Sequence, residues 1–124
     1  MHNLPENRST MEQIKVIARF NINGGKEAAF KQWAHDLIAI VQAKDPGTFQ
    51  YDWFFNAEDT ECVVLETYED SNAAMAHLAN TGDLLGKVAD LGTLTLELYG
   101  SPSAELAAAL APFNAPTYAF HKGL

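Results

Sequence analysis

The amino-acid sequence predicts one α+β domain whose strands and helices follow the order β-α-β-β-α-β. Two observations predict this class. Four segments either alternate apolar and polar residues or are rich in aromatic residues, as strands are, and two segments repeat apolar residues every three or four positions, as helices do. The chain has 124 residues, of which 48% are hydrophobic, and this suffices for one core without disulfides. The order is the ferredoxin-like arrangement.

The first predicted strand and helix lie before residue 45. Within residues 13–22, polar residues alternate with Ile14, Val16, Ala18, Phe20 and Ile22. The turn Asn23-Gly24-Gly25 ends this strand. The helix that follows carries an apolar stripe of Phe30, Trp33, Ala34, Leu37, Ile38 and Val41. It ends near Pro46 and Gly47, because the residue before proline avoids helical backbone angles and glycine permits the turn.

A hairpin of two strands is predicted next. The first strand, residues 48–55, is aromatic-rich, and one of its faces is expected to carry Phe49, Tyr51, Trp53 and Phe55. A polar turn at residues 56–60 leads to the second strand, residues 61–69.

The last part of the ferredoxin-like order follows the hairpin. Ser71 is a suitable N-cap for a helix over residues 72–80. Thr81-Gly82 is predicted to interrupt this helix, with one or two further turns within residues 83–90. The final strand covers residues 93–99. The chain therefore divides into a flexible leader (1–12), the ferredoxin-like domain (13–100) and a C-terminal extension (101–124).

The extension is predicted to contain a short helix and a short strand. Its alanine-rich segment, residues 104–110, follows capping serines, and residues 116–121 have the composition of a strand. Such a strand would extend a sheet edge of its own subunit or of a partner, and in the second case it would clamp a dimer.

Composition excludes several classes of partner. The 16 acidic residues outnumber the 8 basic ones, for a net charge of −8, which disfavours nucleic acid and anionic membranes. No apolar run approaches the roughly 18 residues of a membrane span, and no signal peptide is visible. One cysteine, Cys62, and four histidines without metal-ligand spacing predict no metal site. We therefore expect a cytoplasmic protein.

Four segments in register resemble the antibiotic biosynthesis monooxygenase superfamily. They are residues 25–30 (GKEAAF), 45–51 (DPGTFQY), 64–70 (VLETYED) and 73–78 (AAMAHL), and the resemblance extends from residue 14 to about residue 100. It implies a dimeric α/β barrel, in which two subunits pack sheet against sheet and each holds a small-molecule pocket between its sheet and its helices. Members include cofactor-independent oxygenases that act on hydroxylated polyaromatics or quinols, and haem-degrading enzymes.

The sequence supports a homodimer independently of the resemblance. Helices cover one face of the sheet, yet the face expected to lie opposite contains the apolar residues Ile17, Phe54, Val64 and Tyr68. The simplest way to cover this apolar face is a second copy of the chain. Glu66 is expected on this inter-subunit side, where it would pair with a cation such as Arg19.

His77 is the candidate catalytic base, because imidazole titrates near neutrality and is able to take a proton from a phenol or quinol. Tyr51 would orient the substrate. Trp33 and Trp53 would be the walls of a slot for a planar ring, with Tyr68 also contacting the substrate. The alternatives are an exposed or half-buried helix histidine without a chemical role and aromatic residues that only fill the core.

The chain departs from the family pattern in ways that bear on activity. Residues 84–88 offer Lys87 but no axial histidine, so haem is disfavoured and no cofactor is expected. The Asn, Trp, Tyr and Arg set of hydroxyanthrone-oxidising members is not reproduced at Val64, Tyr68, Ala74 and Val88. The function indicated is therefore a cofactor-independent monooxygenase of a planar aromatic or quinol. The alternative is a non-catalytic dimer that binds a small molecule or is purely structural.

Overall fold

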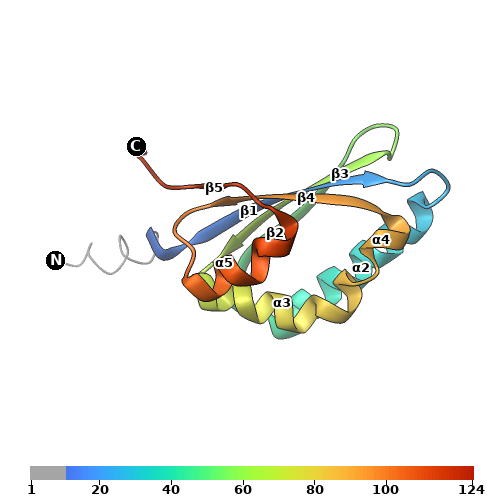
Figure 1. Ribbon diagram of the computed structural model, residues 1–124. Coiled ribbons are helices and arrows are strands. Elements are labelled where there is room, and N and C mark those ends of the chain that lie inside the picture. Colours follow the sequence, from blue (N-terminus) through green and yellow to red (C-terminus); the bar gives the residue numbers. More distant parts are fainter. Residues whose placement is uncertain (1–10) are drawn as a thin grey trace.

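The computed structural model describes residues 11–124 as a single sheet covered on one face by helices (Figure 1). The leader predicted for residues 1–12 lies largely outside this part of the chain. The elements of the ferredoxin-like order are β1 (Ile14–Ile22), α2 (Glu27–Lys44), β2 (Thr48–Phe55), β3 (Glu61–Tyr68), α3 (Ser71–Leu85) and β4 (Gly92–Tyr99). A short helix, α4 (Val88–Leu91), precedes β4. The predicted α+β class and order are confirmed, and the sheet is open.

The sheet has the strand order β2-β3-β1-β4-β5. The central strand β1 pairs antiparallel with both β3 and β4, and β2 and β3 form the predicted hairpin. The last strand, β5 (Thr117–Tyr118), pairs parallel with β4 of its own subunit. It is thus shorter than the predicted strand over residues 116–121.

The apolar stripe predicted for α2 faces the core. Phe30, Trp33, Ala34, Leu37 and Val41 are buried, and the preceding turn contains Gly25 at a φ of +86°, a conformation that glycine adopts readily. The helix ends at Lys44, before Asp45 and Pro46, as predicted.

The prediction that Thr81-Gly82 interrupts the second helix was wrong, because α3 runs through both residues to Leu85. Thr81 is completely buried, and its hydroxyl donates to the backbone carbonyl of His77 at 2.6 Å. The N-cap is also displaced by one residue. Asp70 caps the helix by accepting from the backbone N–H of Ala73 at 2.8 Å, which frees Ser71 for another role.

The C-terminal extension packs against the domain rather than standing apart from it. Its helix α5 (Ala104–Leu110) is followed by a 3-10 turn, η1 (Ala111–Phe113). Ser71 accepts a hydrogen bond from the backbone N–H of Ser103 at 2.9 Å, which ties the start of α5 to the start of α3. Leu106 is buried in the same cluster as Ile14 and Tyr68, so α5 completes part of the core.

The face assigned to β3 must be corrected. Val64 and Tyr68 were expected on the open face of the sheet, and Glu66 at a subunit interface, but all three line a cavity on the helix side. The reason is the hairpin register, in which Glu66 pairs with Tyr51 and Val64 pairs with Trp53. Directly paired residues of neighbouring strands share a face, so β3 presents these side chains beside the aromatic face of β2.

Two smaller expectations about the sheet were also wrong. Phe49 does not share the face of Tyr51, because the β2–β3 pairing is irregular between Thr48 and Gln50, and the Phe49 side chain is 57% exposed. Arg19 does not pair with Glu66. Its guanidinium lies 3.7 Å from the carboxylate of Glu97, on the open face of the sheet. Among the described helices, none is long and apolar enough to cross a membrane.

Candidate functional site

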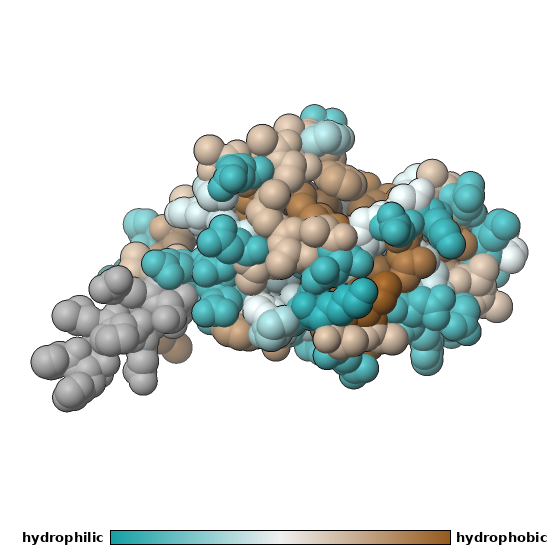
Figure 2. All heavy atoms as spheres, turned by 90° about the horizontal axis from the view of Figure 1, so that it is seen from below, coloured by the Kyte–Doolittle hydropathy of each residue, from teal (hydrophilic) through white to brown (hydrophobic). Residues whose placement is uncertain are grey.

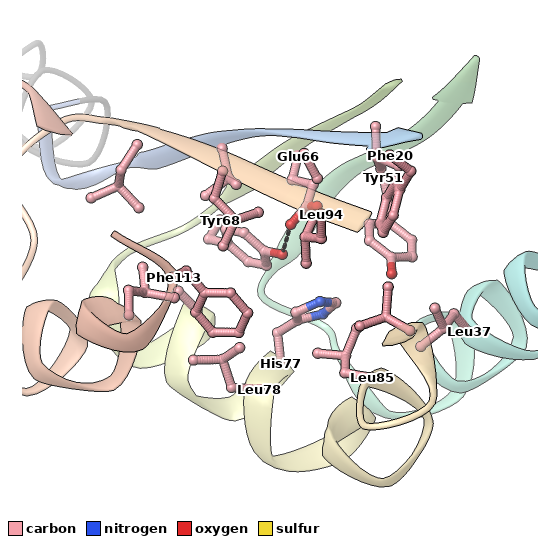
Figure 3. Close-up of a pocket in the computed structure, with 18 of the residues that line it drawn as sticks. Phe20, Leu37, Tyr51, Glu66, Tyr68, His77, Leu78, Leu85, Leu94 and Phe113 are labelled. Carbon is pink, nitrogen blue, oxygen red and sulfur yellow. Dashed lines mark hydrogen bonds between the residues drawn. The ribbon is translucent and has the colours of Figure 1, made fainter. Parts of the chain in front are cut away.

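An apolar cavity lies between the sheet and the helices (Figure 3). Its interior offers about 80 Å³ to the centres of water molecules, whereas one water needs about 10–15 Å³ by this measure. The cavity therefore has room for a small organic molecule. From the helix side, hydrophobic atoms are visible between the polar surfaces of the molecule (Figure 2). The polar and aromatic side chains that line it are Phe20, Tyr51, Trp53, Glu66, Tyr68, His77 and Phe113.

His77 and Asp45 form a buried pair at this cavity. His77 lies on α3 and is 5% exposed, and its Nδ1 is 2.8 Å from a carboxylate oxygen of Asp45, the residue that follows α2. The side-chain amide of Asn80 donates to the other carboxylate oxygen. Because a carboxylate only accepts hydrogen bonds, Nδ1 carries the proton and Nε2 is the basic nitrogen.

Burial governs the protonation of His77. It lowers the pKa of the imidazole, while the hydrogen bond and the charge of Asp45 act in the opposite direction to a smaller extent. The ring is therefore neutral at pH 7. Since Nε2 makes no hydrogen bond within residues 11–124, it is available to accept a proton from a ligand.

Two tyrosine rings flank the imidazole. The ring centroids of Tyr51 and Tyr68 each lie 5.2 Å from that of His77, and the three side chains point toward the same space in Figure 3. Burial raises the pKa of both tyrosine hydroxyls, with the charge of Glu66 as a further cause. Both hydroxyls thus remain protonated and act as donors.

Glu66 brings a carboxyl group into the same cavity. It accepts a hydrogen bond from the hydroxyl of Tyr68. Burial raises the pKa of Glu66 from 4.5 to about 7, and the hydrogen bond from Tyr68 opposes this rise. A carboxyl group that titrates near neutrality is suited to proton transfer.

The two tryptophans occupy different places. Trp53 lines the cavity, and its indole N–H is buried without an acceptor among the residues described. Trp33 lies in the core instead, where its N–H donates to the backbone carbonyl of Leu84 at 2.7 Å. The rings of the two residues are 6.0 Å apart and nearly perpendicular, so Trp33 packs behind Trp53 and does not reach the cavity.

Of the residues predicted for the site, the structure brings Tyr51, Trp53, Tyr68 and His77 together at one cavity and leaves Trp33 outside it. Sequence reasoning missed Asp45 as the partner of His77, and it assigned Glu66 to the wrong face. The hairpin register carried a signal for Glu66, because pairing Phe55 with Cys62 across the turn places Tyr51 opposite Glu66. The sequence held no comparable signal for Asp45, 32 residues before His77.

The extension also contributes to the cavity. Leu106 and Leu110 of α5 line one side, and Phe113 of η1, which is 41% exposed, lies beside them. These residues follow the last strand of the ferredoxin-like order. The wall of the cavity is therefore not built by the ferredoxin-like elements alone.

The cysteine and two further histidines lie away from the cavity. Cys62 is buried, and burial raises the pKa of its thiol to about 12, which makes it a poor nucleophile. His35 and His121 are exposed. Within residues 11–124, no three His, Cys, Asp or Glu side chains are arranged to hold a metal ion.

Comparison with known proteins gives one family match. The model of the family described as antibiotic biosynthesis monooxygenase matches residues 13–82, which is more than half of the chain. No curated protein matches the sequence.

Several solved structures share the fold. MupZ from Pseudomonas fluorescens is 22% identical with a TM-score of 0.81, and the match covers 91% of this chain and 93% of MupZ. SnoaB from Streptomyces nogalater, a cofactor-independent oxygenase, is 20% identical with a TM-score of 0.63, covering 75% of this chain and 96% of SnoaB. Rv0793 from Mycobacterium tuberculosis is 22% identical with a TM-score of 0.65, and the match covers 73% of this chain and 96% of Rv0793. The larger coverage by MupZ takes in at least part of the extension.

Proposed function

Since the chain belongs to the antibiotic biosynthesis monooxygenase family, we propose that it is a cofactor-independent monooxygenase that oxidises a planar aromatic or quinol with molecular oxygen. The observation that carries this proposal is the hydrogen bond between His77 and Asp45 at the wall of an apolar cavity. A buried, oriented imidazole is the base that such a reaction needs.

The reaction begins with proton removal. Nε2 of His77 takes the proton of a substrate hydroxyl, and the carboxylate of Asp45 stabilises the imidazolium that forms. The resulting phenolate is rich in electrons and reduces oxygen, which bonds to a ring carbon that carries hydrogen. Loss of water then gives the quinone. In the overall balance, one oxygen atom enters the substrate, and the other leaves as water with two substrate hydrogens.

The other side chains of the cavity would bind and orient the ring. Tyr51 supplies a hydroxyl donor beside His77, and Trp53 and Tyr68 supply flat surfaces. The unpaired indole N–H of Trp53 suits a substrate that carries an acceptor oxygen. Trp33 takes an indirect part in this proposal, because it supports Trp53 from the core.

The test is oxygen consumption with a panel of quinols and hydroxylated polyaromatics. Replacing the base, His77→Gln, is expected to lower kcat by about 10²–10⁴-fold. The matched control is His35→Gln, because His35 is an exposed histidine of α2, and it should keep the wild-type rate. Wild-type turnover in the His77→Gln variant would remove the proposed base.

A homodimer is the second part of the proposal. On the open face, Ile17, Val63 and Leu65 are only half-buried, and Phe54 is 54% exposed. A second copy packed sheet to sheet would cover this apolar surface. Sedimentation should report a dimer for the wild type and a monomer for Leu65→Asp, which places a charge in the middle of the face. A monomeric wild type would contradict the proposal.

A binding protein without turnover is the alternative function. Val64, Ala74 and Val88 line the cavity with apolar groups only, where oxidising relatives carry part of their polar set. Thermal-shift measurements with the same aromatic panel distinguish the two functions. Stabilisation by a ligand that is never oxidised would favour binding alone.

A further inference from the structure

Glu66 and His77 approach the cavity from opposite layers of the fold. Glu66 comes from β3 in the sheet, and His77 comes from α3 in the helix layer. In Figure 3 the two side chains converge on the space beside Tyr68, whose hydroxyl donates to Glu66 and whose ring lies 5.2 Å from that of His77. One cavity thus holds a base with a partner and, across from it, a second proton-transfer group.

The surroundings of Glu66 favour its neutral form. The neighbouring strands β1 and β4 present apolar side chains to the cavity, namely Val16, Ala18, Leu96 and Leu98. The titratable groups that line the cavity with Glu66 are Tyr51, Tyr68 and His77, and no lysine or arginine of residues 11–124 lines it. A buried carboxylate without a cation is costly, whereas the acid form is not.

Tyr68 fixes the direction of the carboxyl group. Its hydroxyl donates to Oε1 of Glu66, while Oε2 has no partner among the described residues. When the carboxyl group is protonated on Oε2, its O–H is therefore free to donate to a ligand in the cavity. His77 has no such freedom on Nδ1, which is committed to Asp45.

We propose that Glu66, oriented by Tyr68, is the proton donor of this site and protonates the peroxide formed when oxygen adds to the substrate. The proposal rests on the oxygenase function above and adds a second catalytic residue to it. It assigns separate tasks to the two layers: the helix layer removes the substrate proton, and the sheet layer supplies a proton to oxygen.

The proton balance closes over one turnover. After His77 has taken the hydroxyl proton and oxygen has bonded to carbon, Glu66 gives its proton to the terminal peroxide oxygen. The Glu66 carboxylate then removes the hydrogen from the oxygen-bearing carbon, the O–O bond breaks, and hydroxide leaves as the quinone forms. The imidazolium of His77 protonates the hydroxide to water. Both residues return to their starting states.

The first experiment reads the protonation of Glu66 without any turnover. Infrared difference spectra between the wild type and Glu66→Gln at pH 6 should contain the carbonyl band of a protonated carboxyl group. The matched control is Glu97→Gln, because Glu97 also accepts from a tyrosine two residues later but lies on the open face. The band that is lost in Glu66→Gln must persist in Glu97→Gln. If the spectrum of Glu66→Gln still contains the band, the band does not come from Glu66, and the proposal is overturned.

The second experiment separates proton removal from proton delivery. A substrate that the wild type oxidises is mixed with each variant without oxygen, and then oxygen is added. Glu66→Gln should still form the coloured substrate anion, but product formation should slow by about 10²–10⁴-fold. His77→Gln should fail to form the anion at all.

These measurements distinguish the two proposals. If the wild type oxidises no compound of the panel, the oxygenase function fails, whatever the infrared spectra show. If the wild type oxidises a quinol and Glu66→Gln forms product at the same rate, the role of Glu66 alone fails.

Discussion

The same three-residue pattern occurs on both faces of the sheet with different consequences. Glu66-Thr67-Tyr68 on β3 and Glu97-Leu98-Tyr99 on β4 each contain a tyrosine whose hydroxyl donates to the glutamate two residues earlier. In the first pattern, Tyr68 is buried, and Glu66 is half-buried and lines the apolar cavity. In the second, the Glu97 side chain is 29% exposed and lies 3.7 Å from the guanidinium of Arg19.

The difference comes from the register against β1. Glu66 pairs with Val16, whereas Glu97 pairs with Ile17. Consecutive residues of a strand point to opposite faces, so an offset of one residue sends the two patterns to opposite sides of the sheet. The carboxyl group of Glu97 therefore lies on the open face beside a cation, whereas the carboxyl group of Glu66 lies in an apolar cavity that no lysine or arginine of residues 11–124 lines. The position in the sheet, rather than the local sequence, decides the chemistry.

The largest expected effect is a pH-dependent difference in stability between the wild type and Glu66→Gln. The folded-state pKa of Glu66 is raised from 4.5 to about 7, so its contribution to stability is fully present below pH 4.5 and is lost as the pH rises through 7. The shift corresponds to about 3 kcal/mol. Urea unfolding between pH 4.5 and 8 measures it.

The control for this titration is Glu97→Gln. Because Glu97 is partly solvated, its substitution should change the free energy of unfolding by less than about 0.5 kcal/mol. Parallel stability curves for the wild type and Glu66→Gln would show that burial does not perturb Glu66, and the contrast between the two faces would disappear.

The next effect in size concerns the two tyrosine hydroxyls. Loss of the Tyr68 hydroxyl should destabilise the protein more than loss of the Tyr99 hydroxyl. At pH 8, where Glu66 is mostly charged, Tyr68→Phe deprives a carboxylate in an apolar cavity of its donor and should cost about 1.5–3 kcal/mol. Tyr99→Phe removes a hydroxyl on the open face of the sheet, where water can replace the lost hydrogen bond, so the loss of stability should be clearly smaller than for Tyr68→Phe. Chemical denaturation of both variants tests this. Equal losses would mean that the two hydrogen bonds are equivalent despite their positions.

The smallest expected effect concerns the ion pair of the open face. Arg19→Gln removes the cation next to Glu97, and exposed pairs contribute about 0–1 kcal/mol. The loss should be about 0.5 kcal/mol at low salt and should vanish at 1 M salt, where screening acts over about 3 Å. A loss that is large and independent of salt would indicate that Arg19 has a structural role beyond this pair.

Most elements of the fold were predictable because their signals are local. The alternation of β1 and the stripe of α2 each report burial on one side, and the structure buries all of the predicted residues except Ile38, which is half-buried. No local signal predicts the irregular pairing at Phe49, because a shift in register can occur without any change in the types of residue that the strand contains. The continuation of α3 through Gly82 depends on tertiary packing of Thr81, which overrides the local preference for a break.

The site was predictable in part. His77, Tyr51, Trp53 and Tyr68 meet at one cavity, although Tyr68 was assigned both a substrate contact and a place on the open face. Alternation tells which residues of a strand share a face, but it does not tell which face looks toward the helices. For Glu66, the pairing of β2 with β3 shows that its side chain faces the helices. Asp45 has a clear local explanation as the end of α2, and its contact with His77 arises only when α2 and α3 pack together.

One wall of the cavity is completed late during synthesis of the chain, because the extension contributes to it. Its wall includes Leu106, Leu110 and Phe113, which are made after every strand of the ferredoxin-like order. During synthesis, the apolar lining contributed by β4 and α3 therefore stays uncovered until these residues leave the ribosome. Surface of this kind is prone to aggregation while it is exposed. Residues 104–113 thus shield this apolar lining as well as building one wall of the cavity.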